Sequence, residues 1–132
     1  MNHITAKVQE IKSVQNLNII QLTSKDTPLK MMSLDLNDSI TKGSRVILTC
    51  KPMAIALGKN IEGALSYANQ LQATIISLEI GQLLCTLQLA FEEFVLESVI
   101  TSDSQKKMQL QRGDEVTAFI KSSDLSIAEV LS

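Results

Sequence analysis

The fold is set by residues 113–128, which read GDEVTAFIKSSDLSIA. From Val116 to Ile120 the side chains alternate between two faces, and this period of two predicts a half-buried strand that starts at a Gly-Asp turn. The strand ends in Lys121, Ser122 and Ser123, which offer an ammonium group, two hydroxyls and backbone N–H groups. Such a cluster contains donors only and suits an anion, although a solvated turn is the commoner role of a corner of this kind.

Length and composition limit the classes of protein to which the chain can belong. Its 132 residues, 45% of them hydrophobic, suffice for one compact domain or two small ones. The only cysteines, Cys50 and Cys85, lie in apolar strand-like contexts and are expected to be buried thiols rather than a bridge or a metal pair. Because His3 is the single histidine and no nucleophile stands beside a base, we expect neither a zinc site nor an enzyme.

Charge and hydropathy argue against nucleic-acid and membrane partners. The net charge is −2, and only two arginines and 3% aromatic residues are present, which disfavours phosphate contacts and base stacking. The N-terminal residues alternate like a strand instead of forming a signal peptide, and no apolar run of 18 residues occurs. A cytoplasmic protein without membrane insertion is the expectation.

The chain contains an internal repeat. The first apolar strand pattern returns 67 positions later, and the segment at the end of each copy returns after 70. The matched pairs include Asn2 with Asn69, Ile4 with Leu71, Ala6 with Ala73, Val8 with Ile75, Leu22 with Leu89, Ser33 with Thr101, Gly43 with Gly113 and Lys51 with Lys121. The change in offset implies three extra residues in the second copy, between its third strand and the Arg112-Gly113 turn.

The repeat predicts the architecture. Residues 1–59 form a first unit, residues 60–67 a linker and residues 68–132 a second unit. Each unit has four or five short strands, for which a small closed or partly closed barrel is the economical solution because closure removes exposed edges. Short helical turns are expected only in the linker region and at residues 104–111, where Ser104 is a candidate N-cap. The predicted fold is therefore all-β, with two barrels in tandem.

Several motifs of the second copy resemble one known family. The runs ANQLQATIISLEIGQLLCTLQL, ESVITSDS and GDEVTAFIKSSDLSIA are similar, in order and spacing, to the Mop family of molybdate- and tungstate-binding proteins, the molbindins, whose module is also called the TOBE domain. The resemblance covers residues 69–128 and makes the first unit a diverged copy. It implies a di-Mop protein of two five-stranded OB-type barrels that assembles into dimers or trimers, with molybdate or tungstate bound between units.

The resemblance also implies the ligands of the oxyanion. They are Lys121 and Ser122 at the corner, the stretch from Ser66 to Asn69 before the first strand of the second unit, and Thr101 and Ser104 from a neighbouring unit. One departure is that Ala68 stands where the family has arginine. Losing one charge-assisted hydrogen bond of about 1.5–3 kcal/mol would weaken binding by about tenfold or more.

The first unit departs further from the family pattern. Lys51 is retained and Ser33 keeps one hydroxyl, but Pro52 replaces the corner serine and removes a backbone donor, and Leu36 stands at the second hydroxyl position. We therefore expect this unit to bind an anion poorly by itself and to serve as the structural partner of the second.

Other polar and sulfur-containing residues have simpler interpretations. Methionines at 31, 32 and 53 are expected to fill the core rather than bind a soft metal. Glu92 and Glu93 are expected at a solvated hairpin tip rather than in an acid/base pair. Asp124 is expected to cap the Lys-Ser-Ser corner, to pair with Lys121 or simply to form a turn.

Two functions follow as hypotheses. The first is a non-enzymatic cytoplasmic protein that stores, buffers or senses molybdate or tungstate as a homo-oligomer. The second is an oligomerisation or interaction module of a molybdate transport or regulatory system whose anion sites are degraded. An OB-type barrel that binds nucleic acid is a third hypothesis, opposed by the acidic balance and the scarcity of aromatic residues.

Overall fold

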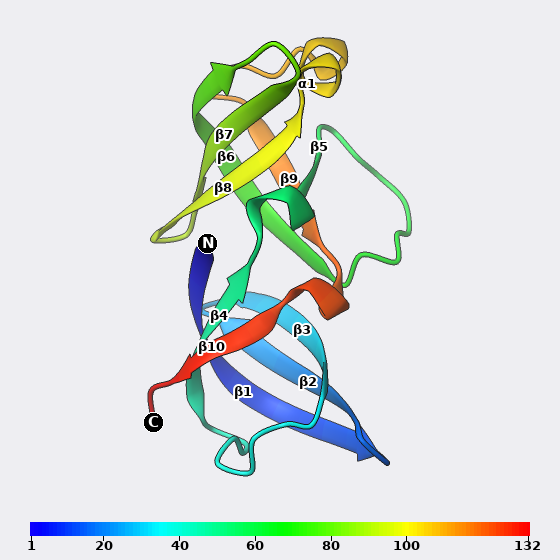
Figure 1. Ribbon diagram of the computed structural model, residues 1–132, viewed down its shortest axis with the longest axis vertical. Coiled ribbons are helices and arrows are strands. Elements are labelled where there is room, and N and C mark those ends of the chain that lie inside the picture. The colour runs from blue at the N-terminus through cyan, green and yellow to red at the C-terminus, as the bar shows by residue number, and fades with distance from the viewer.

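The computed structural model describes all 132 residues and is almost entirely β-structure, arranged as two barrels one above the other (Figure 1). The first unit contains β1 (Asn2–Val14), β2 (Leu17–Ser24), β3 (Thr27–Leu34), β4 (Arg45–Cys50), the 3-10 turn η1 (Pro52–Ala54) and β5 (Ala56–Gly58). The second contains β6 (Asn69–Ile80), β7 (Leu84–Phe91), β8 (Phe94–Thr101), helix α1 (Ser102–Met108), β9 (Glu115–Ile120), the 3-10 turn η2 (Ser122–Asp124) and β10 (Ser126–Val130). The all-β prediction is confirmed.

Each barrel is organised around its long first strand. The inner half of β1 pairs with β4 and its outer half with β2, and a bulge between Val8 and Glu10 bends the strand where the partner changes. The same bulge lies between Ile75 and Ser77 of β6. A bulge increases local twist, which allows one strand to serve both sides of a small barrel.

The two barrels exchange their last strands. One sheet has the order β10-β4-β1-β2-β3 and the other β5-β9-β6-β7-β8. Strand β5 of the first unit therefore pairs with β9, and β10 of the second unit pairs with β4. The boundaries of the two units remain a prediction from the sequence repeat. In the structure, each sheet takes one strand from the other unit.

The exchange is accompanied by one continuous core. A single cluster of 25 buried apolar residues runs through both barrels, from Ile4 and Val8 of β1 to Leu71 and Ile75 of β6. Both cysteines belong to this cluster as free thiols, as expected. Because apolar burial is the main stabilising contribution, neither barrel has a core of its own that is separate from the other.

The repeat is visible in hydrogen bonds as well as in residues. Gly43 has φ +94° and donates its N–H to the carbonyl of Val8 at 2.8 Å. Gly113 has φ +92° and makes the same 2.8 Å bond to Ile75. A positive φ favours glycine, which explains why both copies retain it at this turn.

The three extra residues of the second copy build its helix. Residues 35–44 connect β3 to β4, and the longer segment 102–114 connects β8 to β9 and contains α1. The predicted N-cap at Ser104 is wrong, because Thr101 caps α1 by accepting a hydrogen bond from the N–H of Ser104 at 3.1 Å. The linker, residues 60–67, contains no helical turn.

Strand register also corrects one pair in the repeat. Leu34 lies opposite Leu17 in the first unit, and Thr101 lies opposite Leu84 in the second. The residue equivalent to Thr101 is therefore Leu34 rather than Ser33. The similarity of KMMSLD to SVITSD favours an alignment that is displaced by one position. A displacement of one residue along a strand moves a side chain to the opposite face.

Candidate anion-binding corners

Two equivalent corners follow β4 and β9. The first corner comprises Lys51 and η1, and the second comprises Lys121 and η2. The lysines have nearly the same backbone, with φ −77° and ψ 144° for Lys51 and φ −66° and ψ 148° for Lys121. No side chain caps either turn. The corners differ chemically because Pro52 has neither a hydroxyl nor an N–H, whereas Ser122 has both.

Asn69 connects the second corner to the first barrel. Its side chain is fully buried; Oδ1 accepts from the N–H of Lys30 at 2.7 Å, and Nδ2 donates to the carbonyl of Lys30 at 2.9 Å. Nδ2 also donates to the carbonyl of Ile120, next to Lys121, at 3.0 Å. Both amide protons are thus occupied, which makes Asn69 a positioning residue and leaves its side chain no donor for an anion.

Asn2 makes the equivalent connection at the first corner. Its Oδ1 accepts from the N–H of Glu97 at 2.7 Å, and its Nδ2 donates to the carbonyl of Glu97 at 2.9 Å. We call these two arrangements the asparagine clasps. The repeat already pairs Asn2 with Asn69. Only the structure shows that each side-chain amide bonds both backbone groups of one residue in the other barrel, as a neighbouring strand would.

The corners lie against opposite units. Turn η2 packs on β3 of the first unit, and turn η1 packs on β8 of the second. The second of these contacts includes a 2.8 Å hydrogen bond from the hydroxyl of buried Ser98 to the carbonyl of Ile55. Within one chain, the corner that contains Lys121 therefore lies beside β3, and the corner that contains Lys51 lies beside β8.

Thr101 and Ser104 stand apart from Lys121. Their hydroxyls are 2.9 Å apart at the start of α1, which Figure 1 places at the outer end of the second barrel, whereas η2 lies between the barrels. At the corresponding place in the first unit the residue is Leu34. One chain therefore does not gather Lys121 and the Thr101-Ser104 pair at one point.

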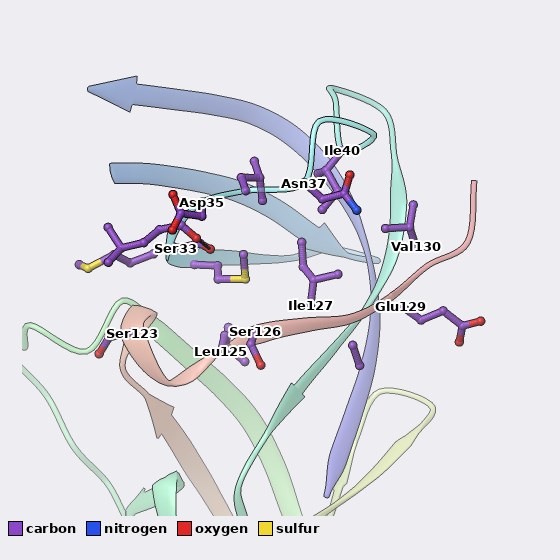
Figure 2. Close-up of a pocket in the computed structure, with 15 residues that line it drawn as sticks. Ser33, Asp35, Asn37, Ile40, Ser123, Leu125, Ser126, Ile127, Glu129 and Val130 are labelled. Atoms are coloured by element: carbon purple, nitrogen blue, oxygen red, sulfur yellow. Dashed lines mark hydrogen bonds between the residues drawn. The ribbon is translucent and has the colours of Figure 1, made fainter. Parts of the chain in front are cut away.

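The remaining predicted ligands lie in two places. Ser66 is exposed in the segment before β6. Ser33 and Ser123 line a groove of about 640 Å³ between β3 with its following loop and η2 with β10 (Figure 2). The groove contains no lysine or arginine, and its charged residues are Asp35 and Glu129. This groove therefore has the wrong charge for an oxyanion.

The charged groups near the corners are unevenly distributed. Neither Lys51 nor Lys121 forms an ion pair, because the three salt bridges join Lys25 to Glu93, Lys59 to Asp114 and Lys107 to Asp103. Asp124 neither caps η2 nor pairs with Lys121. Instead it lines a cavity of about 260 Å³ together with Lys51 and buried Cys50, whose pKa is raised by burial.

The hairpin tips contribute a contact that the sequence did not reveal. Glu92 is exposed, as expected, but its carboxylate accepts from the hydroxyls of Ser24 at 2.6 Å and Thr27 at 2.8 Å. The neighbouring Lys25–Glu93 pair, at 3.5 Å, is exposed and contributes little to stability. The β2–β3 and β7–β8 hairpins therefore meet at their tips and help to fix one barrel on the other.

No group of three or more His, Cys, Asp and Glu residues could hold a metal ion. No helix is long and apolar enough to cross a membrane.

Comparison with known proteins identifies the class to which this architecture belongs. Two barrels with exchanged strands match a crystal structure of the cytoplasmic molybdate-binding protein ModG with molybdate bound, at a TM-score of 0.88 and 19% identity over 96% of this chain and 94% of that one. The fold is thus the two-domain OB-type fold of that protein. Residues 65–127, which make up most of the second unit, match the family model of the TOBE domain. No curated protein matches the chain in sequence.

Proposed function

We propose that this chain is a molybdate- or tungstate-binding protein of the cytoplasm that stores, buffers or senses the oxyanion. The observation that carries the proposal is the second corner, where Lys121 without an ion pair precedes Ser122 and Ser123 in a TOBE domain. The matching ModG structure, which contains molybdate, supports the same ligand class. The function requires no catalytic residue.

The chemistry of the corner suits a fully deprotonated tetrahedral dianion. Lysine and the backbone amides are donors only, and each serine hydroxyl can rotate to donate. Monohydrogen phosphate carries a proton that must find an acceptor, whereas molybdate and tungstate carry none at neutral pH. A site made from donors therefore favours the metal oxyanions over phosphate, and discrimination against sulfate depends on the size of the site.

A complete ligand set requires two copies of the chain. Within one chain, the corner with Lys121 and Ser122 faces the β3 side, where Leu34 stands in the place of Thr101. The Thr101-Ser104 pair lies at the outer end of the second barrel, where β8 ends and α1 begins. Strand β8 packs against η1, the turn that contains Pro52. We infer that Lys121 of one copy meets Thr101 and Ser104 of another, in a homodimer or homotrimer.

Calorimetric titration tests the proposal. The full chain should release saturable heat with molybdate or tungstate and none with phosphate. Lys121→Ala combined with Ser122→Ala should abolish that heat without changing the far-UV circular dichroism spectrum. Lys51→Ala is the matched control, since its corner contains Pro52, and it should leave the affinity within about twofold. Absence of heat with every anion, or unchanged affinity in the double variant, would contradict the proposed site.

A further inference from the structure

The second corner offers one cationic side chain of its own, Lys121, to a dianion, because Ala68 is too short to supply another. The geometry points to Lys30, on β3 of the first unit, as the second cationic group of this oxyanion site. This inference rests on the proposed function. It gives the diverged first unit a direct part in binding.

Lys30 lies beside the position that lacks a cation. Lys30 and Ala68 line the same cavity of about 340 Å³, whose other polar residues are Gln9, Gln21 and Thr23. The clasp from Asn69, the residue after Ala68, holds both backbone groups of Lys30 at 2.7 and 2.9 Å. Lys30 is therefore held against the segment that precedes β6.

The same clasp relates Lys30 to the second corner. The other proton of Asn69 Nδ2 goes to the carbonyl of Ile120, whose next residue is Lys121. Turn η2 continues from Lys121 and packs on β3, the strand that contains Lys30. Ala68, Lys30 and Lys121 thus surround one buried asparagine, and an anion placed at the corner lies within the field of both lysines.

A purely structural role does not account for Lys30. Its side chain is exposed and takes part in none of the three salt bridges. Lysines on edge strands commonly prevent pairing with other chains, but the backbone groups of Lys30 are already covered by Asn69. The ammonium group is therefore left without a partner in the protein.

The equivalent position at the first corner has the opposite charge. Asn2 clasps Glu97 as Asn69 clasps Lys30. Asp124 adds a second carboxylate to the cavity that Lys51 lines. The two corners share their backbone but differ at the clasped residue, which is Lys30 at the second corner and Glu97 at the first, whereas Asp124 is part of η2 and lies near both. A carboxylate repels an oxyanion, so Glu97 disfavours binding at the first corner, whereas Lys30 favours it at the second.

Molybdate titration of four proteins tests this inference: the full chain, Lys30→Ala, Lys30→Ala with Ala68→Arg, and Lys12→Ala. Removal of Lys30 should weaken affinity by about tenfold, the effect of one charge-assisted hydrogen bond. Arginine at position 68 should restore affinity to within about threefold, because it places a cation in the same cavity. Lys12→Ala removes an equal charge from the exposed outer half of β1 and should change affinity by less than twofold.

The outcomes separate this inference from the proposed function. If the full chain binds molybdate and the Lys121→Ala, Ser122→Ala variant does not, the corner stands. Unchanged affinity in Lys30→Ala then overturns only the role of Lys30. Equal losses in Lys30→Ala and Lys12→Ala, or a loss that Ala68→Arg leaves unrepaired, also overturn it. Absence of binding by the full chain overturns both. Urea unfolding midpoints of all variants check that each protein is folded.

Discussion

Replacement of Asn69 by alanine should separate the two barrels at one of their clasps. The side chain makes three hydrogen bonds, of 2.7, 2.9 and 3.0 Å, and is fully buried. At a net contribution of about 1 kcal/mol for each bond, Asn69→Ala should lower the free energy of unfolding by about 3 kcal/mol. Asn2→Ala removes two backbone hydrogen bonds, of 2.9 and 2.7 Å, and should cost about 2 kcal/mol.

Two measurements check this prediction. Urea unfolding gives the change in free energy, and amide hydrogen exchange locates it. In Asn69→Ala the N–H of Lys30 loses its side-chain acceptor and should exchange faster, while the N–H of Glu97 keeps its protection. Asn2→Ala should produce the reverse pattern. A loss below about 0.5 kcal/mol, or unchanged exchange at Lys30, would refute the assignment of Asn69 as a clasp.

Two further predictions concern the turns before β4 and β9. The pKa of Asp114 lies below its ordinary value because Gln111 N–H, at 3.0 Å, and then Lys59 Nζ, at 3.1 Å, donate to its carboxylate. This carboxylate therefore stabilises the fold above its unfolded-state pKa, and the contribution is lost as the pH falls through the folded-state value. Asp114→Asn should lower the free energy of unfolding at pH 7 and make it less dependent on pH under acidic conditions, as measured by urea unfolding at a series of pH values. The same pH dependence in both proteins would contradict this. Gly113→Ala forces a side chain into φ +92° and should cost about 1–2 kcal/mol in the same assay, as should Gly43→Ala at φ +94°. A difference above about 1 kcal/mol between the glycine variants would show that the turns are not equivalent.

The strands and the repeat were predictable because burial follows alternation along each strand. The residues of β1 and β6 that the repeat pairs, such as Val8 and Ile75, are all buried. The strand exchange was not predictable from the same pattern. Both barrels offer an equivalent edge, and the five residues of β10 contain no information about which edge they join.

The candidate site was predictable in its chemistry more than in its roles. The Lys121-Ser122 corner follows from the motif alone, since the strand must end where the polar residues begin. Asn69 was expected to bind the anion, yet all its protons serve the backbone. An asparagine looks the same in a sequence whether its amide faces a ligand or a strand edge. The role proposed for Lys30 could not be predicted from the motif, because this residue belongs to the other unit and lies near Ala68 only in the folded chain.

The differences between the two units separate what the fold requires from what anion binding requires. Both units retain the clasp and the glycine turn, and we expect the loss of either to destabilise the pair of barrels. At the first corner, by contrast, Pro52 and Glu97 stand where the second has Ser122 and Lys30. Neither of these changes disturbs the backbone of η1, which matches that of η2. On the proposed function, the first unit can therefore lose its own ligands without losing its place in the fold. It still supplies β5 to the second sheet, accepts β10 beside β4, and carries Lys30 to the corner that retains the anion ligands.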